Sequence, residues 1–91
     1  MSDLVELAKN GDLVRIRELV TQFGVDINAR HPPDGTTALY WSACSGHVVA
    51  CDWLLRHGAG ANLPTVKSGS MPLHGAADRG HHDCAFLLLR K

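Results

Sequence analysis

The sequence has no long apolar run and no cluster of like charges. None of its segments approaches the roughly 18 apolar residues that a membrane-spanning helix needs. Its nine basic and nine acidic residues cancel, and neither sign forms a run longer than a pair. A surface that follows a phosphate backbone would need clustered Lys and Arg. We therefore expect neither a membrane partner nor a nucleic-acid partner.

The sequence also lacks a secretory pattern and an even number of cysteines. The opening stretch, MSDLVELAKNGD, lacks a basic segment followed by an apolar one, so we expect no signal peptide. The three cysteines are an odd number, which without a signal peptide indicates reduced thiols. We expect them to be small buried side chains in a cytoplasmic or nuclear protein.

What the sequence does contain is one unit that occurs three times. The central copy begins with a turn dipeptide at Asp34-Gly35, breaks at Gly46-His47 and ends a second, longer helical pattern at Gly58. Its glycines, leucine and histidine recur 34 residues later, at Gly69, Leu73, Gly80 and His81. Its apolar pattern and its central glycine also occur 35 residues earlier, at Leu4, Ala8, Gly11, Leu19 and Val20. Periods of about 20–50 residues are typical of solenoids, in which each unit buries its apolar face on its neighbour.

The motifs of the unit resemble those of the ankyrin repeat family over nearly the whole chain. That family has a period of about 33 residues and a T-P-L-H-x-A core. The second copy has TALY at 37–40, which departs from the first four residues of the motif at two positions. The third copy has MPLH at 71–74, which departs at one. The resemblance implies an all-α fold, an ankyrin-type solenoid of about three helix-turn-helix repeats with short β-hairpin arms.

The repeats divide the chain into three parts of one ankyrin repeat domain, 1–91. Repeat 1 covers 1–30 and lacks its first hairpin, repeat 2 covers 34–64, and repeat 3 covers 67–91 and ends before its C-cap. We expect helices over Asp3–Asn10, Leu13–Phe23, Ala38–Ser45, Val48–His57, Pro72–Arg79 and His82–Arg90. Asp12 and Thr37 are placed to cap the helices that follow them. We expect the most buried residues to include Leu19, Leu39, Leu54, Leu55 and Leu73.

The last helix pattern differs from the others in its outward residues. Phe86 and Leu87 stand where the second repeat has Asp52 and Trp53, so the outer face becomes apolar. A terminal repeat of a complete solenoid normally turns a polar face outward. We therefore expect further ankyrin repeats C-terminal in the full-length chain, or else a dimer of this segment through Phe86 and Leu87.

One group of residues suggests chemistry. Thiols and an imidazole of the kind that bind zinc occur close together at Cys44, His47 and Cys51, and the expected fold brings His81, His82 and Cys84 near them. Zinc needs ligands that converge, and the break at Gly46 prevents the first three from sharing one helical face. No cysteine has an activating base placed beside it by the pattern. We expect no enzyme, no cofactor and no metal, and keep a metal-dependent protein as an alternative.

The two tryptophans have different expected roles. Trp41 falls where packing between paired helices is the simpler interpretation, whereas Trp53 fits either packing or a binding anchor.

The resemblance implies a protein-protein interaction module that binds another protein through a concave groove of hairpin tips and first helices. The family's variable contact positions correspond here to Lys9, Asn10, Pro33, Asp34, Thr36, Cys44, Ser45, Lys67, Ser68, Ser70, Asp78 and Arg79. The other interpretation is an N-terminal cap of a longer array that binds nothing itself. The partner's identity is not encoded in any motif.

Overall fold

The chain folds into three helix pairs stacked side by side. The computed structural model describes residues 4–31, 34–65 and 68–90. Within those residues the helices are α1 (Leu4–Asn10), α2 (Leu13–Thr21), α3 (Ala38–Cys44), α4 (Val48–Arg56), α5 (Pro72–Asp78) and α6 (His82–Leu89). All six expected helices are present. Five of them end one or two residues earlier than expected, and α1 ends where expected.

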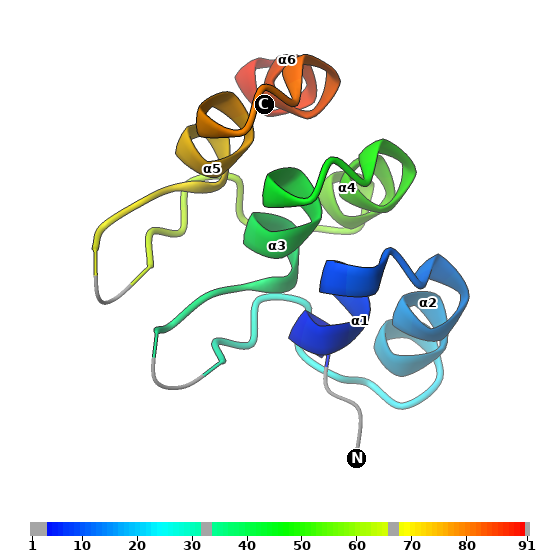
Figure 1. Cartoon of the computed structure of the whole chain (residues 1–91). Helices are drawn as coiled ribbons and strands as arrows, with labels where there is room; N and C mark the ends of the chain where they lie inside the picture. The colour runs from blue at the N-terminus through cyan, green and yellow to red at the C-terminus, as the bar shows by residue number, and fades with distance from the viewer. Residues whose placement is uncertain (1–3, 32–33, 66–67, 91) are drawn as a thin grey trace.

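The helices form two layers with extended connections on one side. In Figure 1, α1, α3 and α5 make one layer and α2, α4 and α6 make the other. Helix α3 packs against both α1 and α5, so the middle pair has a neighbour on each side. The two long connections project on the side of the first layer, away from the second (Figure 1). We call α1, α3 and α5 the inner helices, and α2, α4 and α6 the outer helices.

The two helices of each pair are separated by a glycine turn. Gly11, Gly46 and Gly80 have positive φ angles of 70°, 76° and 74°, in the left-handed region that only glycine adopts without strain. The amide of each donates to the carbonyl three residues earlier, at 3.1–3.2 Å. Three turns of one geometry, at the spacing found in the sequence, confirm the repeat.

Side chains that the sequence marks as caps begin two of the helices. The Asp12 carboxylate accepts a hydrogen bond from the Arg15 amide at 3.3 Å, and the Thr37 hydroxyl accepts one from the Tyr40 amide at 3.2 Å. These bonds satisfy backbone donors that have no partner inside a helix. At the start of α5, where no threonine is present, the Met71 amide donates to Nδ1 of His74 at 3.1 Å.

The core runs through all three pairs. Ile16, Leu39 and Leu54 are among its largest fully buried side chains. Leu55 is buried as expected, whereas the expectation for Leu19 and Leu73 was wrong because both are only partly buried. Each of these two lies in an end repeat, which has a neighbour on one side only.

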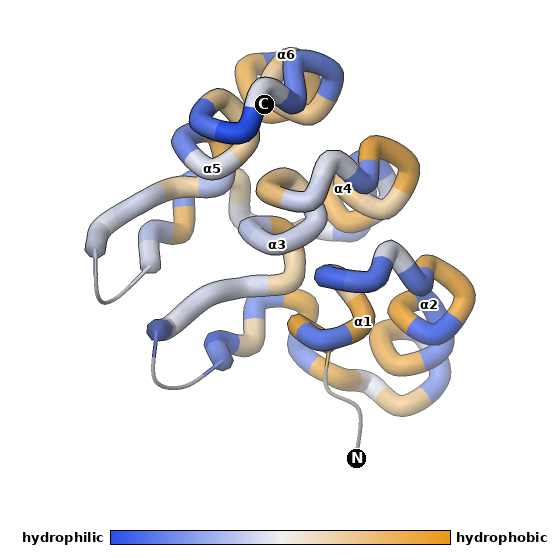
Figure 2. The backbone as a smooth tube through the Cα atoms, viewed as in Figure 1, coloured by the Kyte–Doolittle hydropathy of each residue, from blue (hydrophilic) through white to orange (hydrophobic). Residues whose placement is uncertain are grey.

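The connections close as tight turns instead of strands. We call residues 31–36 the first arm and residues 65–70 the second arm; their tips, 32–33 and 66–67, lie outside the described residues. The His31 amide donates to the Thr36 carbonyl, and the Thr65 amide donates to the Ser70 carbonyl, both at 2.8 Å. Within the described ranges, His31 and Thr36 form an isolated antiparallel bridge and there is no longer strand. Figure 2 shows that the described parts of both arms are mostly polar or neutral.

The three cysteines are free and buried, as the sequence indicated. Cys51 of α4 and Cys84 of α6 are fully buried, and their thiols are hydrogen-bonded to each other. Burial, followed by the neighbouring Cys84 thiol, raises the pKa of Cys51 to about 12. Burial also raises the pKa of Cys44 and of Cys84.

Among the described residues, no helix has the length and hydropathy to span a bilayer.

Because the folded state holds these thiols protonated, we expect them to resist alkylation. Native protein treated with iodoacetamide at pH 8 should show almost no mass increase, and the same protein in denaturant should gain three adducts. Rapid labelling of Cys51 in the native protein would contradict its burial.

The same burial makes stability depend on pH. The thiol of Cys51 ionises near pH 8.5 in the unfolded chain and only toward pH 12 in the folded one, so the free energy of unfolding should fall as pH rises between these values.

We also expect the middle pair to be the most stable. Leu54→Ala should cost about 2–5 kcal/mol in the free energy of unfolding, because this side chain is fully buried. Amide hydrogen exchange should be slower at Leu54 and Leu55 than in α6, since end repeats open first. Uniform protection across the three pairs would contradict this expectation.

Candidate functional site

The inner helices and the arms offer the surface on which the sequence places its contact residues. Of the twelve expected contact residues, the structure leaves eight wholly or partly exposed: Lys9, Asn10, Asp34, Ser45, Ser68, Ser70, Asp78 and Arg79. Pro33 and Lys67 lie outside the described residues. Figure 1 shows that the elements carrying the eight face the side from which the arms project. We call these eight the inner-surface residues.

Two of the expected contact residues are inside the protein. Cys44 is 2% exposed and Thr36 is 3% exposed, so neither is available to a partner in this arrangement. The Cys44 sulfur packs against the backbone of α5 at Gly75, where a Cβ atom would collide with it. The Thr36 carbonyl closes the first arm. Neither residue belongs to the inner surface.

An aromatic pair lies in the middle inner helix, and the sequence interpretation missed it as a pair. Tyr40 and Trp41 are both half-buried, and their rings meet edge to face with centroids 5.5 Å apart. The Lys9 ammonium of α1 lies 4.6 Å from the centroid of the Trp41 ring, within the range of a cation–π interaction. Trp41 also packs against the core, as expected.

A signal for this pair was present in the sequence. The corresponding positions of repeat 1 hold Val5 and Glu6, and those of repeat 3 hold His74 and Gly75. Only the middle repeat places two aromatic residues there. Comparing the three repeats at these positions, instead of treating each departure from the family motif as a local defect, would have identified the pair.

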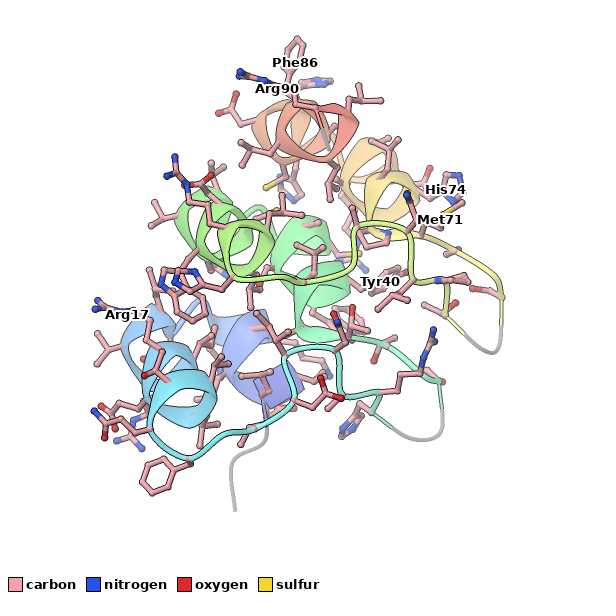
Figure 3. The ribbon with its side chains drawn as sticks, turned by 180° about the vertical axis from the view of Figure 1, so that it is seen from behind. Arg17, Tyr40, Met71, His74, Phe86 and Arg90 are labelled. Atoms are coloured by element: carbon pink, nitrogen blue, oxygen red, sulfur yellow. The ribbon has the colours of Figure 1, made fainter. Side chains whose placement is uncertain are left out.

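Tyr40 is held as a neutral hydroxyl by its surroundings. Burial is the main cause that raises its pKa, and the Cys44 thiol, to which it is hydrogen-bonded, raises it further. Arg79 acts in the opposite direction, and Asp78 adds a smaller increase. Figure 3 shows the Tyr40 side chain near the level of the arms, in the same part of the molecule as Met71 and His74.

Charged groups lie on both sides of the aromatic pair. On α1, Lys9 and Glu6 form an ion pair at 3.8 Å, with more than a third of each side chain exposed. At the end of α5, Asp78 and Arg79 are exposed, and neither forms an ion pair within the described residues. The inner surface therefore has an aromatic centre and a charged border.

The outer helices form a separate cleft. It lies between α2 and α4, has a volume of about 310 Å³ and is lined by Val14, Arg17, Glu18, Thr21, Gln22, Trp53 and His57. The His57 ring stacks on Trp53 with centroids 3.9 Å apart, and its Nδ1 lies 2.8 Å from the Trp53 carbonyl oxygen. Since a carbonyl only accepts, Nδ1 carries the proton. Intramolecular packing thus covers one face of Trp53, the residue for which the sequence left two roles open.

The structure does not gather the cysteines and histidines into a ligand set. In the described part of the chain, no three His, Cys, Asp or Glu residues are placed to hold a metal ion. The His47 imidazole has a structural role instead: its Nε2–H donates to the Lys9 carbonyl at 3.0 Å. The buried thiols are protonated, and a thiolate is the form that binds zinc.

Similar proteins share parts of this chain. Human ankyrin repeat domain-containing protein 40 is 36% identical over 70 residues, covering 77% of this chain and 18% of that protein. The Schizosaccharomyces pombe palmitoyltransferase akr1 is 36% identical over 62 residues, covering 68% of this chain and 10% of that protein. The Dictyostelium discoideum 26S proteasome non-ATPase regulatory subunit 10 is 29% identical over 87 residues, covering 96% of this chain and 37% of that protein. The chain spans less than two fifths of the length of each of these relatives.

A solved structure and a family model agree with the geometry. The crystal structure of the human ASB11 ankyrin repeat domain matches with a TM-score of 0.87 at 33% sequence identity, covering 99% of this chain and 39% of that one. The family model described as ankyrin repeats in three copies matches residues 4–91. With its three helix pairs, glycine turns and projecting arms, the chain belongs to the ankyrin repeat family.

Proposed function

We propose that the inner surface binds another protein, with Tyr40 and Trp41 at its centre. Ankyrin repeats generally serve protein interaction. The observation that supports this surface is the half-buried aromatic pair bordered by exposed charges. Protein interfaces have the same anatomy, with aromatic residues enriched at a centre that is poor in charge and with a polar rim. Tyr and Trp are also among the residues whose truncation weakens binding most.

The border of the proposed surface supplies orientation. Asp34 of the first arm and Arg79 after α5 carry opposite charges, and Lys9 and Glu6 add a pair on α1. Such charges steer the encounter with a partner and fix its register, and removing one that is paired across the interface also weakens binding. The neutral Tyr40 hydroxyl adds a group that both donates and accepts.

We propose no catalysis by this chain, since the cysteines that could act as nucleophiles are buried and protonated. The reduced thiols support a cytoplasmic or nuclear location. A role as the N-terminal cap of an array, without a ligand of its own, is the alternative that the first experiment addresses.

The first experiment replaces Asp34 and Arg79 together by alanine. Both lie outside the core, so the melting temperature should stay nearly unchanged, because such surface changes cost no more than about 0.5 kcal/mol each. Affinity for a partner purified with the wild-type protein should fall about tenfold or more, as expected for interface residues. Isothermal titration calorimetry measures the change.

The matched control removes an Asp and an Arg from an outer helix. Asp52 and Arg56 form an exposed ion pair at 3.0 Å on α4, and replacing both by alanine should leave affinity intact. If this control loses binding and the Asp34/Arg79 variant does not, the outer helices carry the function. If neither variant changes binding of a partner that needs residues 1–91, the inner surface is not the site.

We also propose that a further ankyrin repeat of the full-length protein packs on α5 and α6. In each earlier junction the histidine of the next repeat covers the glycine turn: a methyl group on Gly11 would lie 2.7 Å from Nδ1 of His47, and one on Gly46 would lie 2.6 Å from Nδ1 of His81. Among the described residues, no atom lies within 4 Å of the same point on Gly80. The face beside Gly80 thus repeats a geometry that elsewhere receives the next unit.

The end face is apolar as well as open. Leu89 is 66% exposed, whereas Leu55, its counterpart one repeat earlier, is 8% exposed. Phe86 is 66% exposed and points away from the rest of the molecule (Figure 3). A second copy of the chain could cover Phe86 and Leu87, and that dimer is the competing occupant.

The second experiment compares the 91-residue chain with one extended by an added ankyrin repeat, each with Leu89 or with Leu89→Ala. The extension should stabilise the chain by at least about 1.5–3 kcal/mol, the value of burying one leucine. Leu89→Ala should cost little in the short chain and about 2–5 kcal/mol in the extended one. Urea denaturation measures both. Equal costs in the two lengths would show that the added repeat does not cover this face, and a dimeric short chain in light scattering would favour the second copy.

A further inference from the structure

One arginine links the bases of the two arms. The Nη1 atom of Arg30 donates to the Gly35 carbonyl of the first arm at 3.0 Å and to the Pro64 carbonyl, directly before the second arm, at 2.6 Å. A guanidinium NH₂ group carries two hydrogens, so one nitrogen can serve both acceptors. These two carbonyls belong to different repeats, and the Arg30–Pro64 bond joins positions 34 residues apart.

Hydrogen bonds within each arm close it separately, and in the second arm side-chain bonds among Thr65, Ser68 and Ser70 add to the backbone ones. Each arm closes through two backbone hydrogen bonds: in the first, between His31 and Thr36 and between Gly35 and His31; in the second, the same pattern 34 residues later. Within the described ranges, no other hydrogen bond to the Gly35 or Pro64 carbonyl is present. A bond from a guanidinium to a carbonyl is charge-assisted and stronger than a neutral one.

Arg30 differs in this respect from the arginines on the outer helices. Arg15 pairs with Asp12, the residue just before α2, and Arg56 pairs with Asp52 within α4. Those pairs are local and exposed, and such pairs contribute little to stability. Arg30 reaches backbone carbonyls in two repeats instead, which fits a residue that sets the position of one arm against the other.

We propose that Arg30 joins the two arm bases into one edge of the binding surface and so favours a protein partner that contacts Asp34 of the first arm and Ser68 of the second at once. This rests on the proposed function, because only then does the position of the arms affect binding. A partner lying across both arms gains affinity when their relative position is already fixed, since less freedom is lost on binding. A partner that contacts only one arm gains nothing from the linkage.

The structural half of the proposal is tested without any partner. Amide hydrogen exchange is compared in the wild-type chain, Arg30→Met, Arg30→Lys and the matched control Arg56→Met. Exchange at Gly35 and Thr65 should be about tenfold faster in Arg30→Met, the factor for losing one charge-assisted hydrogen bond. Arg30→Lys should give an intermediate value, because an ammonium retains the charge and several N–H donors but its nitrogen ends one atom short of the position of Nη1. Arg56→Met should leave both amides unchanged.

Two outcomes would overturn this half. Unchanged exchange at both amides in Arg30→Met would mean that the bonds do not hold the arms. Equal acceleration at Leu54 and Leu55 would mean that Arg30 supports the whole fold and does not act on the arms.

The binding half uses a displayed library of random 16-residue peptides as the probe. Peptides selected on the wild-type chain are retained only if the Asp34/Arg79 double alanine variant weakens them. Each retained peptide is then tested against the single variants Asp34→Ala and Ser68→Ala. A peptide weakened by only one of them needs one arm, and a peptide weakened by each of them needs both arms. Peptides that need both arms should bind Arg30→Met about fivefold to tenfold more weakly, whereas peptides that need one arm should bind it as they bind the wild type.

The two proposals fail in different ways. If no selected peptide depends on Asp34 and Arg79, the proposed binding surface is wrong while the exchange result for Arg30 still stands. If two-arm peptides exist and Arg30→Met binds them with wild-type affinity, the surface is supported and the role of Arg30 is overturned.

Discussion

The structure depends on the contact that each helix pair makes with the next one. A pair of helices seven to nine residues long cannot bury its own apolar face, and isolated helices of that length are marginal in water. Burial comes instead from stacking, with α3 placed between α1 and α5. The histidine just before each later outer helix, His47 or His81, lies over the glycine turn of the preceding pair, so the backbone and the side-chain packing fix the same register. The two end repeats have this contact on one side only, and their leucines Leu19 and Leu73 are less buried than those of the middle repeat.

Much of the fold could be predicted because its signals are local in sequence. Glycine turns at regular intervals, a threonine or aspartate before a helix and an apolar stripe are all readable within one repeat. They gave six helices with ends within two residues in the described ranges, and the caps at Asp12 and Thr37. The burial of Leu39 and Leu54 could also be predicted, because both lie on the apolar stripe of the repeat that has a neighbour on each side.

The candidate site was less predictable because it depends on contacts between repeats. Cys44 occupies a position that the family exposes, and its burial requires that residue 75, in the next repeat, be a glycine. Arg30 has the sequence context of an ordinary surface residue, and its link to Pro64 exists only once the two repeats are stacked. The aromatic pair at Tyr40 and Trp41 acquires its charged border from Lys9 in the preceding repeat and from Arg79 in the following one. A sequence read one repeat at a time contains none of this information.

The contact between Cys44 and Gly75 also limits how the protein can change over time. A side chain at position 75 would need the volume that the sulfur now fills, so that position can enlarge only if position 44 becomes smaller. The two sites therefore form a pair whose substitutions are tolerated in one order: residue 44 must shrink before residue 75 can grow. Tyr40, which is hydrogen-bonded to the Cys44 thiol, would lose its partner at the first step. Divergence of the buried contact would thus alter the half-buried aromatic centre, and a change of partner could begin at a residue that no partner touches.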